Sequence, residues 1–174
     1  MSLESNLNKL NKDEFISKFG VIFEKTQWIA EKLFDQQPFK DKDDLINKMT
    51  QIYESSSKNE ILKILNAHPK LAVEKNLTEH SSKEQSRANL KNCTQKEYDE
   101  FKILNNNYEK KFGFPFIIAV KGKDKIEILN NFRQRINNGI ELEFIESKKQ
   151  VKKIALFRLE ELFTKWNKQN LEIR

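Results

Sequence analysis

One helix-start pattern recurs along this chain and limits what the chain can fold into. A residue whose side chain can cap a helix stands three positions before a Glu in five places: Asn11–Glu14, Ser57–Glu60, Ser81–Glu84, Thr94–Glu97 and Asp124–Glu127. In this pattern the capping side chain accepts a hydrogen bond from the third backbone N–H of the helix, and the Glu reaches back to the N–H of the capping residue. Its recurrence favours an all-α fold.

Apolar residues follow most of these starts at the spacing of one helix face. The stripes are Leu45–Tyr53, Ile61–Leu65, Tyr98–Tyr108 and Ile126–Ile136, with two further helices expected over Val21–Phe34 and Val151–Trp166. Gly139 is expected to end the helix that contains Ile126–Ile136. The 174 residues include only 4 Gly and 3 Pro, so tight turns must be few. We therefore predict one compact all-α domain over residues 1–174, a bundle of about seven to nine helices.

Composition argues against several classes of function. The net charge is +6, but the lysines are mixed with Glu and Asp and form no basic stripe with aromatic residues, so no nucleic-acid partner is expected. No run reaches the ~18 apolar residues of a membrane span, and the N-terminal stretch lacks the apolar core of a signal peptide. The sequence contains no zinc-finger spacing of Cys and His. The single cysteine, Cys93, cannot form an internal disulfide, which is typical of a cytoplasmic protein.

The segment "FGFPFIIAV", Phe112 to Val120, does not fit a surface helix. It is almost entirely apolar, and Pro115 argues against both a continuous helix and a central strand. We expect a buried, irregular or extended segment that leads into the helix at Asp124. Its backbone N–H and C=O groups then need partners, which are either other groups of the chain or a polar ligand.

Arg158 is out of place in its predicted helix. The residues Val151, Ile154, Ala155, Leu159, Leu162 and Trp166 share one apolar face, and Arg158 falls in the middle of that face. Arginine is rarely buried without a partner. Arg158 should therefore meet a carboxylate, from a Glu of the protein or from an anionic ligand, unless its side chain reaches solvent at the helix edge.

The two histidines of the chain differ in their surroundings. Pro69 disfavours the helical conformation at the residue before it, so the preceding helix should end near His68. An imidazole held at such a junction suits proton transfer near neutral pH, although an ordinary surface or capping role is open as well. His80 has no comparable neighbour and is interpreted as a surface residue in the following loop.

Glu84 would lie at the third helix position if Ser81 is the capping residue. The positive end of the helix dipole would then favour the ionised carboxylate. A carboxylate near an imidazole can form an acid–base pair, but the chain has other capping glutamates. From these residues alone, the sequence predicts an α-helical domain with a candidate His/Glu/Arg site.

Several motifs together resemble the OHCU decarboxylase family. They are "HPKLA", "LTEHSSKEQSRANL", "LNNNYEKKFGFPFIIAVKGK" and "IALFRLEELF", with "NKDEFISKFG" and "TQWIAEKLFDQQPF" nearer the N-terminus. They occur in the order of the family, and the similarity spans nearly the whole chain. Members of this family act on 2-oxo-4-hydroxy-4-carboxy-5-ureidoimidazoline (OHCU) in the conversion of urate to allantoin.

This resemblance implies roles for particular residues. His68 and Glu84 match the catalytic pair of the family. The positions matching its substrate-binding residues are Pro69, Ser81, Gln85, Phe116, Ile117, Ile118, Ala119, Val120 and Arg158. The resemblance also implies a carboxy-lyase that makes S-allantoin from a small anionic ureide, works without a metal or cofactor, and forms a homodimer.

Two departures and two alternatives accompany the resemblance. Lys70 stands where many members have Asp, and Asn89 replaces a common Gly; both bear on how the substrate is positioned. One alternative is a non-catalytic helical binding module with the same fold, in which Arg158 is satisfied by a carboxylate of the protein. The other is a decarboxylase or hydrolase that acts on a related ureide.

Overall fold

Helices make up most of the part of the chain that the structure describes. A computed structural model describes residues 6–172, and within that range it contains eight α-helices, one short 3₁₀ helix and no strand. The predicted all-α fold and the predicted number of helices are confirmed. No helix in the same range is both long and apolar enough to cross a membrane.

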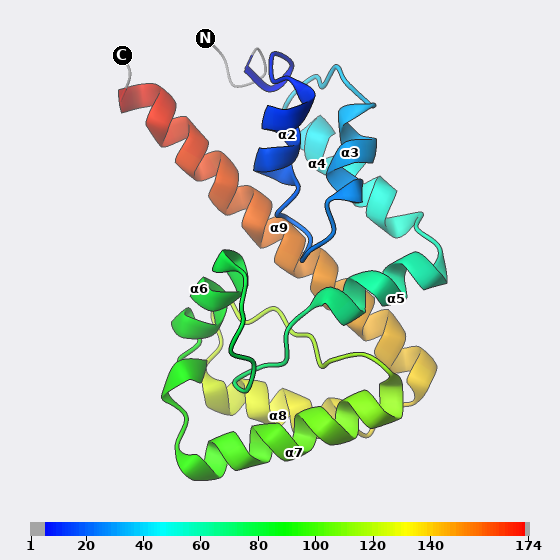
Figure 1. Ribbon diagram of the computed structural model, residues 1–174, viewed down its shortest axis with the longest axis vertical. Helices are drawn as coiled ribbons and strands as arrows, with labels where there is room; N and C mark the ends of the chain where they lie inside the picture. The colour runs from blue at the N-terminus through cyan, green and yellow to red at the C-terminus, as the bar shows by residue number, and fades with distance from the viewer. Residues whose placement is uncertain (1–5, 173–174) are drawn as a thin grey trace. The chain divides into compact units, whose positions relative to one another are not determined.

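The described chain divides into two compact units (Figure 1). Unit 1 takes in the chain up to Ile64 and again from Lys152, and unit 2 runs from Leu65 to Val151. Two helices have residues in both units, α5 (Lys58–Ala67) and α9 (Ile140–Glu172). The single domain expected over residues 1–174 remains a prediction.

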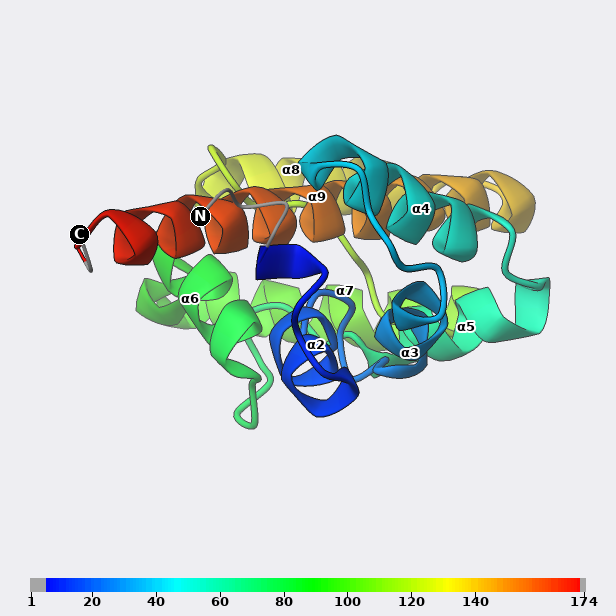
Figure 2. The same cartoon turned by 90° about the horizontal axis from the view of Figure 1, so that it is seen from above.

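Unit 1 packs three helices around aromatic side chains. These helices are α2 (Lys12–Phe19), α3 (Trp28–Phe34) and α4 (Lys42–Glu54), and α3 contacts both of the others (Figure 2). The ring of Phe15 lies 4.6 Å from that of Phe19 and 5.8 Å from that of Phe39, centroid to centroid. The helix expected over Val21–Phe34 is shorter than predicted, because Lys25 adopts a positive φ of 46° and interrupts the helix before Trp28.

Unit 2 contains α6 (Glu79–Arg87), η1 (Leu90–Asn92), α7 (Gln95–Phe112), α8 (Lys125–Arg135) and the first turns of α9. Helix α7 contacts α8, and aromatic rings fill the space beside them. The Phe116 ring stacks on Phe132 with 3.9 Å between centroids, and Tyr108 meets both rings edge-on. On α8 the buried face holds Ile128 and Leu129, whereas Ile126, expected on that face, is 57% exposed.

Four of the five predicted helix starts are confirmed. Asn11, Thr94 and Asp124 form capping boxes with the Glu three positions on, and Ser57 exchanges the same two hydrogen bonds with Glu60. A cap at each of these positions satisfies backbone N–H groups that have no partner inside the helix.

The fifth predicted start, at Ser81, is wrong. Helix α6 begins one turn earlier, where the side chain of Thr78 accepts from the backbone N–H of Ser81. Thr caps a helix much as Ser does, and the residues between the two contain no Gly or Pro to delay the start. Glu84 therefore lies beyond the first turn of α6, and the predicted influence of the helix dipole does not apply to it. His80 lies in the same helix and is half-buried, so its assignment to a surface loop is wrong as well.

Gly139 does not end a helix. Helix α8 ends at Arg135, with Ile136 as its cap, and Gly139 precedes α9. The Lys111 ammonium donates to the carbonyl oxygens of Ile136 and Asn138 at 2.8 and 2.9 Å. A cationic side chain from α7 thus meets carbonyls past the end of α8, a role that the sequence prediction gave to glycine.

The capping box at Thr94 predicts an acid-dependent loss of stability. The hydrogen bond from the Lys125 side chain, and next the one from the backbone N–H of Thr94, hold the pKa of the Glu97 carboxyl below its usual value. A lowered folded-state pKa contributes stability that is present above the unfolded-state pKa and disappears as pH falls through the folded-state pKa. Glu97→Gln should therefore lower the Tm at pH 7, and this difference from wild type should shrink as pH falls below the usual Glu pKa of about 4.3 and through the lowered folded-state pKa. Thermal melts followed by circular dichroism measure it; a difference that persists at low pH would contradict this assignment.

Candidate active site

His68 lies immediately after α5, as the His-Pro pattern predicts. The helix ends at Ala67, and the backbone N–H of His68 donates to the carbonyl of Leu65 at 3.2 Å. The side chain of His68 is buried, with 9% of the residue exposed, and Pro69 after it is half-buried. The imidazole is thus held where a helix gives way to an irregular loop that runs to α6.

That loop is attached to two helices of unit 2 through its Leu71–Ala72 peptide. The side-chain amide of Asn105, on α7, donates to the Leu71 carbonyl at 3.0 Å. The backbone N–H of Ala72 donates to Oε1 of Gln85, on α6, at 3.0 Å. The loop that carries His68 is therefore hydrogen-bonded to the helix that carries Glu84 and Gln85.

Ser81 and Gln85 lie one turn apart on α6, and each is 4% exposed. Oε1 of Gln85 accepts the Ala72 N–H, whereas its Nε2 atom is buried without a hydrogen-bond partner among the described residues. A buried donor in that state costs free energy unless another group accepts from it. Glu84, next to Gln85 in sequence, is half-buried.

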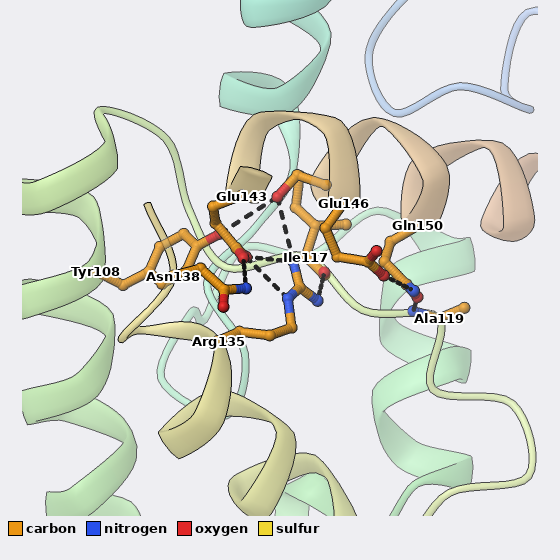
Figure 3. A network of polar contacts seen from close by, with 9 residues as sticks. Tyr108, Ile117, Ala119, Arg135, Asn138, Glu143, Glu146 and Gln150 are labelled. Atoms are coloured by element: carbon orange, nitrogen blue, oxygen red, sulfur yellow. Dashed lines mark hydrogen bonds and ion pairs between the residues drawn. The ribbon is translucent and has the colours of Figure 1, made fainter. Parts of the chain in front are cut away.

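The apolar segment after α7 is irregular and buried, as predicted. Gly113 has a left-handed φ of 79° and caps α7, and residues 114–120 are all buried without helix or strand structure. Three of its backbone groups have partners within the chain. The Ile117 carbonyl accepts from Arg135 at 2.7 Å, and the Ala119 N–H donates to Gln150 at 2.9 Å (Figure 3). The Val120 carbonyl accepts from the N–H of Lys123 at 3.0 Å.

Arg135 belongs to a buried polar network behind this segment (Figure 3). The Glu143 carboxylate, 0% exposed, accepts from Nε of Arg135 at 2.8 Å, from the Tyr108 hydroxyl at 2.5 Å and from the Asn138 amide at 2.8 Å. Burial, and then the hydrogen bond to Glu143, raise the pKa of the Tyr108 hydroxyl. The guanidinium of Arg135 also lies over the Phe116 ring, 4.5 Å from its centroid. The network fixes the irregular segment to α7, α8 and α9.

Arg158 is buried, as predicted, and its partner is a carboxylate of the protein. The residue is 2% exposed; its guanidinium donates to Glu24 at 3.0 Å and to the carbonyl of Ile22 at 3.2 Å. These contacts lie within unit 1, whereas the other predicted site residues belong to unit 2. The pairing with Glu24 is the arrangement that the non-catalytic alternative expects for Arg158.

The buried pair predicts a stability effect in unit 1. Glu24→Gln keeps the shape of the side chain but removes the charge opposite Arg158, so the unfolding free energy should fall by about 3 kcal/mol, the lower end of the cost of leaving one member of a buried ion pair without its partner. Urea unfolding measures it. Glu31→Gln, at a half-buried carboxylate on α3, is the control and should change the unfolding free energy less. Equal stability of both variants would contradict a stabilising role for the buried pair.

The two departures from the family pattern take different structural forms. Asn89 has a left-handed φ of 61°, and Asn tolerates that conformation better than most residues other than Gly. The substitution for Gly is therefore compatible with the backbone. Lys70 forms an ion pair with Glu109 at 2.7 Å, with both side chains partly exposed.

Comparisons with known proteins agree with these observations. A family model described as OHCU decarboxylase matches residues 8–160. The 2-oxo-4-hydroxy-4-carboxy-5-ureidoimidazoline decarboxylase of Haloferax volcanii is 34% identical over 158 residues, covering 91% of this chain and 94% of that protein. The uric acid degradation bifunctional protein of Bacillus sp. (strain TB-90) is 40% identical over 157 residues, covering 90% of this chain and 31% of that protein. The chain spans about a third of the length of this relative and of PucL from Bacillus subtilis.

Solved structures have the same fold. A crystal structure of (S)-allantoin synthase matches with a TM-score of 0.74 at 29% identity, covering 92% of this chain and 54% of that one. An OHCU decarboxylase crystallised in the presence of (S)-allantoin matches with a TM-score of 0.69 at 20% identity, covering 89% and 99% of the two chains, and supports the fold alone. With a family match over residues 8–160 and a relative aligned over nearly its full length, this chain belongs to the OHCU decarboxylase family.

Proposed function

We propose that this protein decarboxylates OHCU to S-allantoin in urate degradation. The observation that carries the proposal is the family match over residues 8–160, which includes every residue assigned to the site by resemblance. Unit 2 supports it, since the His68 loop is hydrogen-bonded to the helix that holds Ser81, Glu84 and Gln85.

The proposed reaction needs an electron sink, and the substrate carries one. In OHCU the carboxylate is attached to a ring carbon next to a C=N bond. When the bond to CO₂ breaks, its electron pair forms a C=C bond to the neighbouring ring carbon, and the C=N pair moves to the nitrogen, which takes up a proton. The resulting enol then gains a proton at the neighbouring ring carbon, while its hydroxyl loses its proton and becomes the carbonyl of allantoin. The protein has to orient the carboxylate, exclude water and deliver that proton to one face.

His68 and Glu84 divide the proton chemistry in this proposal. His68, buried at the end of α5, hydrogen-bonds the substrate carboxylate or hydroxyl and acts as the proton donor. Glu84 holds N–H groups of the ring or of the ureido substituent and directs protonation to the face that gives S-allantoin. The buried Nε2 of Gln85 offers a donor to a substrate oxygen.

Residues 116–120 contribute backbone groups to substrate binding in the same proposal, within limits that the structure sets. The Ala119 N–H already donates to Gln150, so it can reach a substrate only if Gln150 moves. The Ile117 carbonyl accepts from Arg135 and still has a second lone pair. The N–H groups of Ile117 and Ile118 are the better candidates for donation to the ring.

Arg158 and Pro69 complete the substrate contacts implied by the resemblance. Glu24 neutralises Arg158, so any contact of this guanidinium with an anionic substrate has to use donors that Glu24 does not occupy. Pro69 restricts the backbone beside His68 and offers an apolar surface to the ring.

We further propose a cytoplasmic homodimer that folds as one domain over residues 1–174. Three apolar side chains near the start of α9 support an interface with a second copy: Ile140, Leu142 and Ile145 are 58%, 57% and 50% exposed. Sedimentation equilibrium should give twice the chain mass, and Leu142→Glu should shift the population toward monomer. A monomeric wild-type chain would refute the dimer.

The decisive test of the activity forms the unstable substrate in situ. Urate is oxidised and the product hydrolysed in the cuvette, and circular dichroism follows the appearance of chiral allantoin. We expect faster and more enantioselective formation of S-allantoin than in buffer. A rate and enantioselectivity equal to those in buffer would favour the non-catalytic binding module. Turnover of other ureides but not of OHCU would favour a decarboxylase or hydrolase that acts on a related ureide.

A further inference from the structure

One peptide group in the His68 loop is held from both sides. The Leu71 carbonyl and the Ala72 N–H belong to the same peptide unit; Asn105 donates to the first and Gln85 accepts from the second, each at 3.0 Å. The two amide side chains come from different helices, α7 and α6. The orientation of this peptide plane is therefore set by two helices together, three residues after His68.

The backbone at this peptide is in a conformation that needs such support. Ala72 has a φ of 65°, in the left-handed region that non-glycine residues rarely occupy. An alanine held there costs on the order of 1 kcal/mol or more, and persists only when the surroundings determine it. The hydrogen bonds on either side of Leu71–Ala72 are surroundings of that kind.

Asn105 is suited to hold the loop because its own position is fixed. Its residue is 2% exposed, on the apolar face of α7 that also holds Phe101 and Tyr108. Its Nδ2 donates to the Phe101 carbonyl at 2.8 Å as well as to Leu71. The bond to Phe101 holds the amide on its own helix. The bond to Leu71 therefore fixes the loop relative to α7.

The same peptide also determines which end of the Gln85 side-chain amide faces the loop. The Ala72 N–H is a donor, so it requires the oxygen of the Gln85 amide, and this directs the amide nitrogen elsewhere. That nitrogen is the buried Nε2 atom described above. Gln85 therefore presents a donor, and recognises an oxygen of its ligand rather than an N–H.

We propose that Asn105 is a positioning residue: through the Leu71–Ala72 peptide it fixes both the loop that carries His68 and the donor orientation of Gln85. The inference rests on the proposed catalytic role of His68, but its geometry can be tested without activity. Asn105 acts through the peptide and does not itself contact the substrate.

The test uses the small number of histidines. With only 2 His in the chain, the imidazole resonances of His68 and His80 can be assigned by substituting His80. Asn105→Leu should move the His68 resonance and its titration midpoint while His80 changes little. In the allantoin assay, kcat should fall by about 10- to 100-fold, more than KM rises, as expected when a reacting group is misplaced.

Asn131→Leu, at a half-buried asparagine, is the control for losing an amide bond to the helix backbone. Asn131 lies on α8 in the same unit and makes the same bond to the carbonyl four residues earlier, at 2.8 Å, without a contact to the loop. It should leave the His68 resonance and kcat unchanged. An equal effect of Asn131→Leu and Asn105→Leu on His68 would reduce the role of Asn105 to general stability and overturn the proposal.

A second variant separates positioning from packing. Gly adopts a positive φ without the cost that Ala bears. Ala72→Gly combined with Asn105→Leu should therefore move the His68 resonance part of the way back to its wild-type position and recover part of kcat. An unmoved His68 resonance in Asn105→Leu overturns the inference, whatever the activity. If the wild-type chain is inactive but the resonance moves and is partly restored, the proposed function fails and the positioning role stands.

Discussion

Replacing His68 with Ala should lower kcat/KM for OHCU by about 10²- to 10⁴-fold, the range expected when a general acid is lost. The chain has one other imidazole, that of His80 on α6, and the proposed reaction gives it no role. The far-UV circular dichroism should be unchanged, because His68 follows the end of α5 and lies outside the helices. Rates come from the in situ assay, corrected for the reaction in buffer.

His80→Ala is the control for the loss of an imidazole and should keep near-wild-type activity. His68→Gln adds a second comparison, because Gln hydrogen-bonds but does not exchange a proton near neutral pH. If His68→Gln retains the wild-type rate, His68 binds the substrate without acting as the proton donor. If His68→Ala retains it, the residue has no part in the reaction.

Local signals in the sequence predicted most of the helices because capping depends on neighbours only. Asn11, Ser57, Thr94 and Asp124 act on N–H groups within three residues, so their roles can be inferred from spacing. The same logic failed at Ser81, where Thr78 stands one turn earlier with an equivalent hydroxyl. Spacing alone does not rank two capping residues that compete for one helix.

Two further errors have different causes, one a long-range contact and one a local backbone conformation. Gly139 was assigned a capping role that Lys111 takes over from 25 and 27 residues away in sequence. Lys25 interrupts the predicted helix over Val21–Phe34 although the apolar residues before it, such as Ile22, are buried as expected. Burial of apolar side chains can be predicted from their pattern, but it occurs in turns as well as in helices.

The candidate site was predicted more fully than the groups that support it. A polar residue on an apolar helix face signalled Arg158 correctly, and the same signal was present for Asn105 on α7 and for Arg135 on α8. What the sequence could not supply was the partner. Asn105 reaches Leu71 across 34 residues, and Arg135 reaches Ile117 across 18. Such pairs can be identified only from the tertiary structure, because packing brings the two segments together.

The irregular segment 114–120 explains why this support is needed. Buried backbone outside helices and strands must find hydrogen-bond partners, and here Arg135 and Gln150 supply two of them from α8 and α9. Rigid partners also hold the remaining backbone groups in place, which suits the ring contacts proposed for this segment. The network around Glu143 thus contributes to the stability of unit 2 and also holds the segment proposed to bind the substrate ring.

Glu143→Gln should lower the unfolding free energy by about 3–5 kcal/mol, the cost of leaving one member of a buried ion pair without its partner. The carboxylate accepts from Arg135, Tyr108 and Asn138 and is 0% exposed. A neutral amide leaves the Arg135 guanidinium buried without a countercharge and turns one acceptor into a donor that faces other donors. Urea unfolding, followed by circular dichroism, measures the change.

The partly exposed pair of Arg133, on α8, and Glu100, on α7, provides the control. Arg133 makes two hydrogen bonds to Glu100, at 2.6 and 2.8 Å, but its side chain is 49% exposed, so Glu100→Gln should have a far smaller effect. The double variant Arg135→Met with Glu143→Leu removes both buried charges at once and should be less destabilised than Glu143→Gln, since no unpaired charge remains. If the double variant instead loses the sum of the single effects, the two residues act independently and the network does not depend on their pairing. If it recovers stability but loses allantoin formation, the buried charges serve the placement of the Ile117 carbonyl more than the fold.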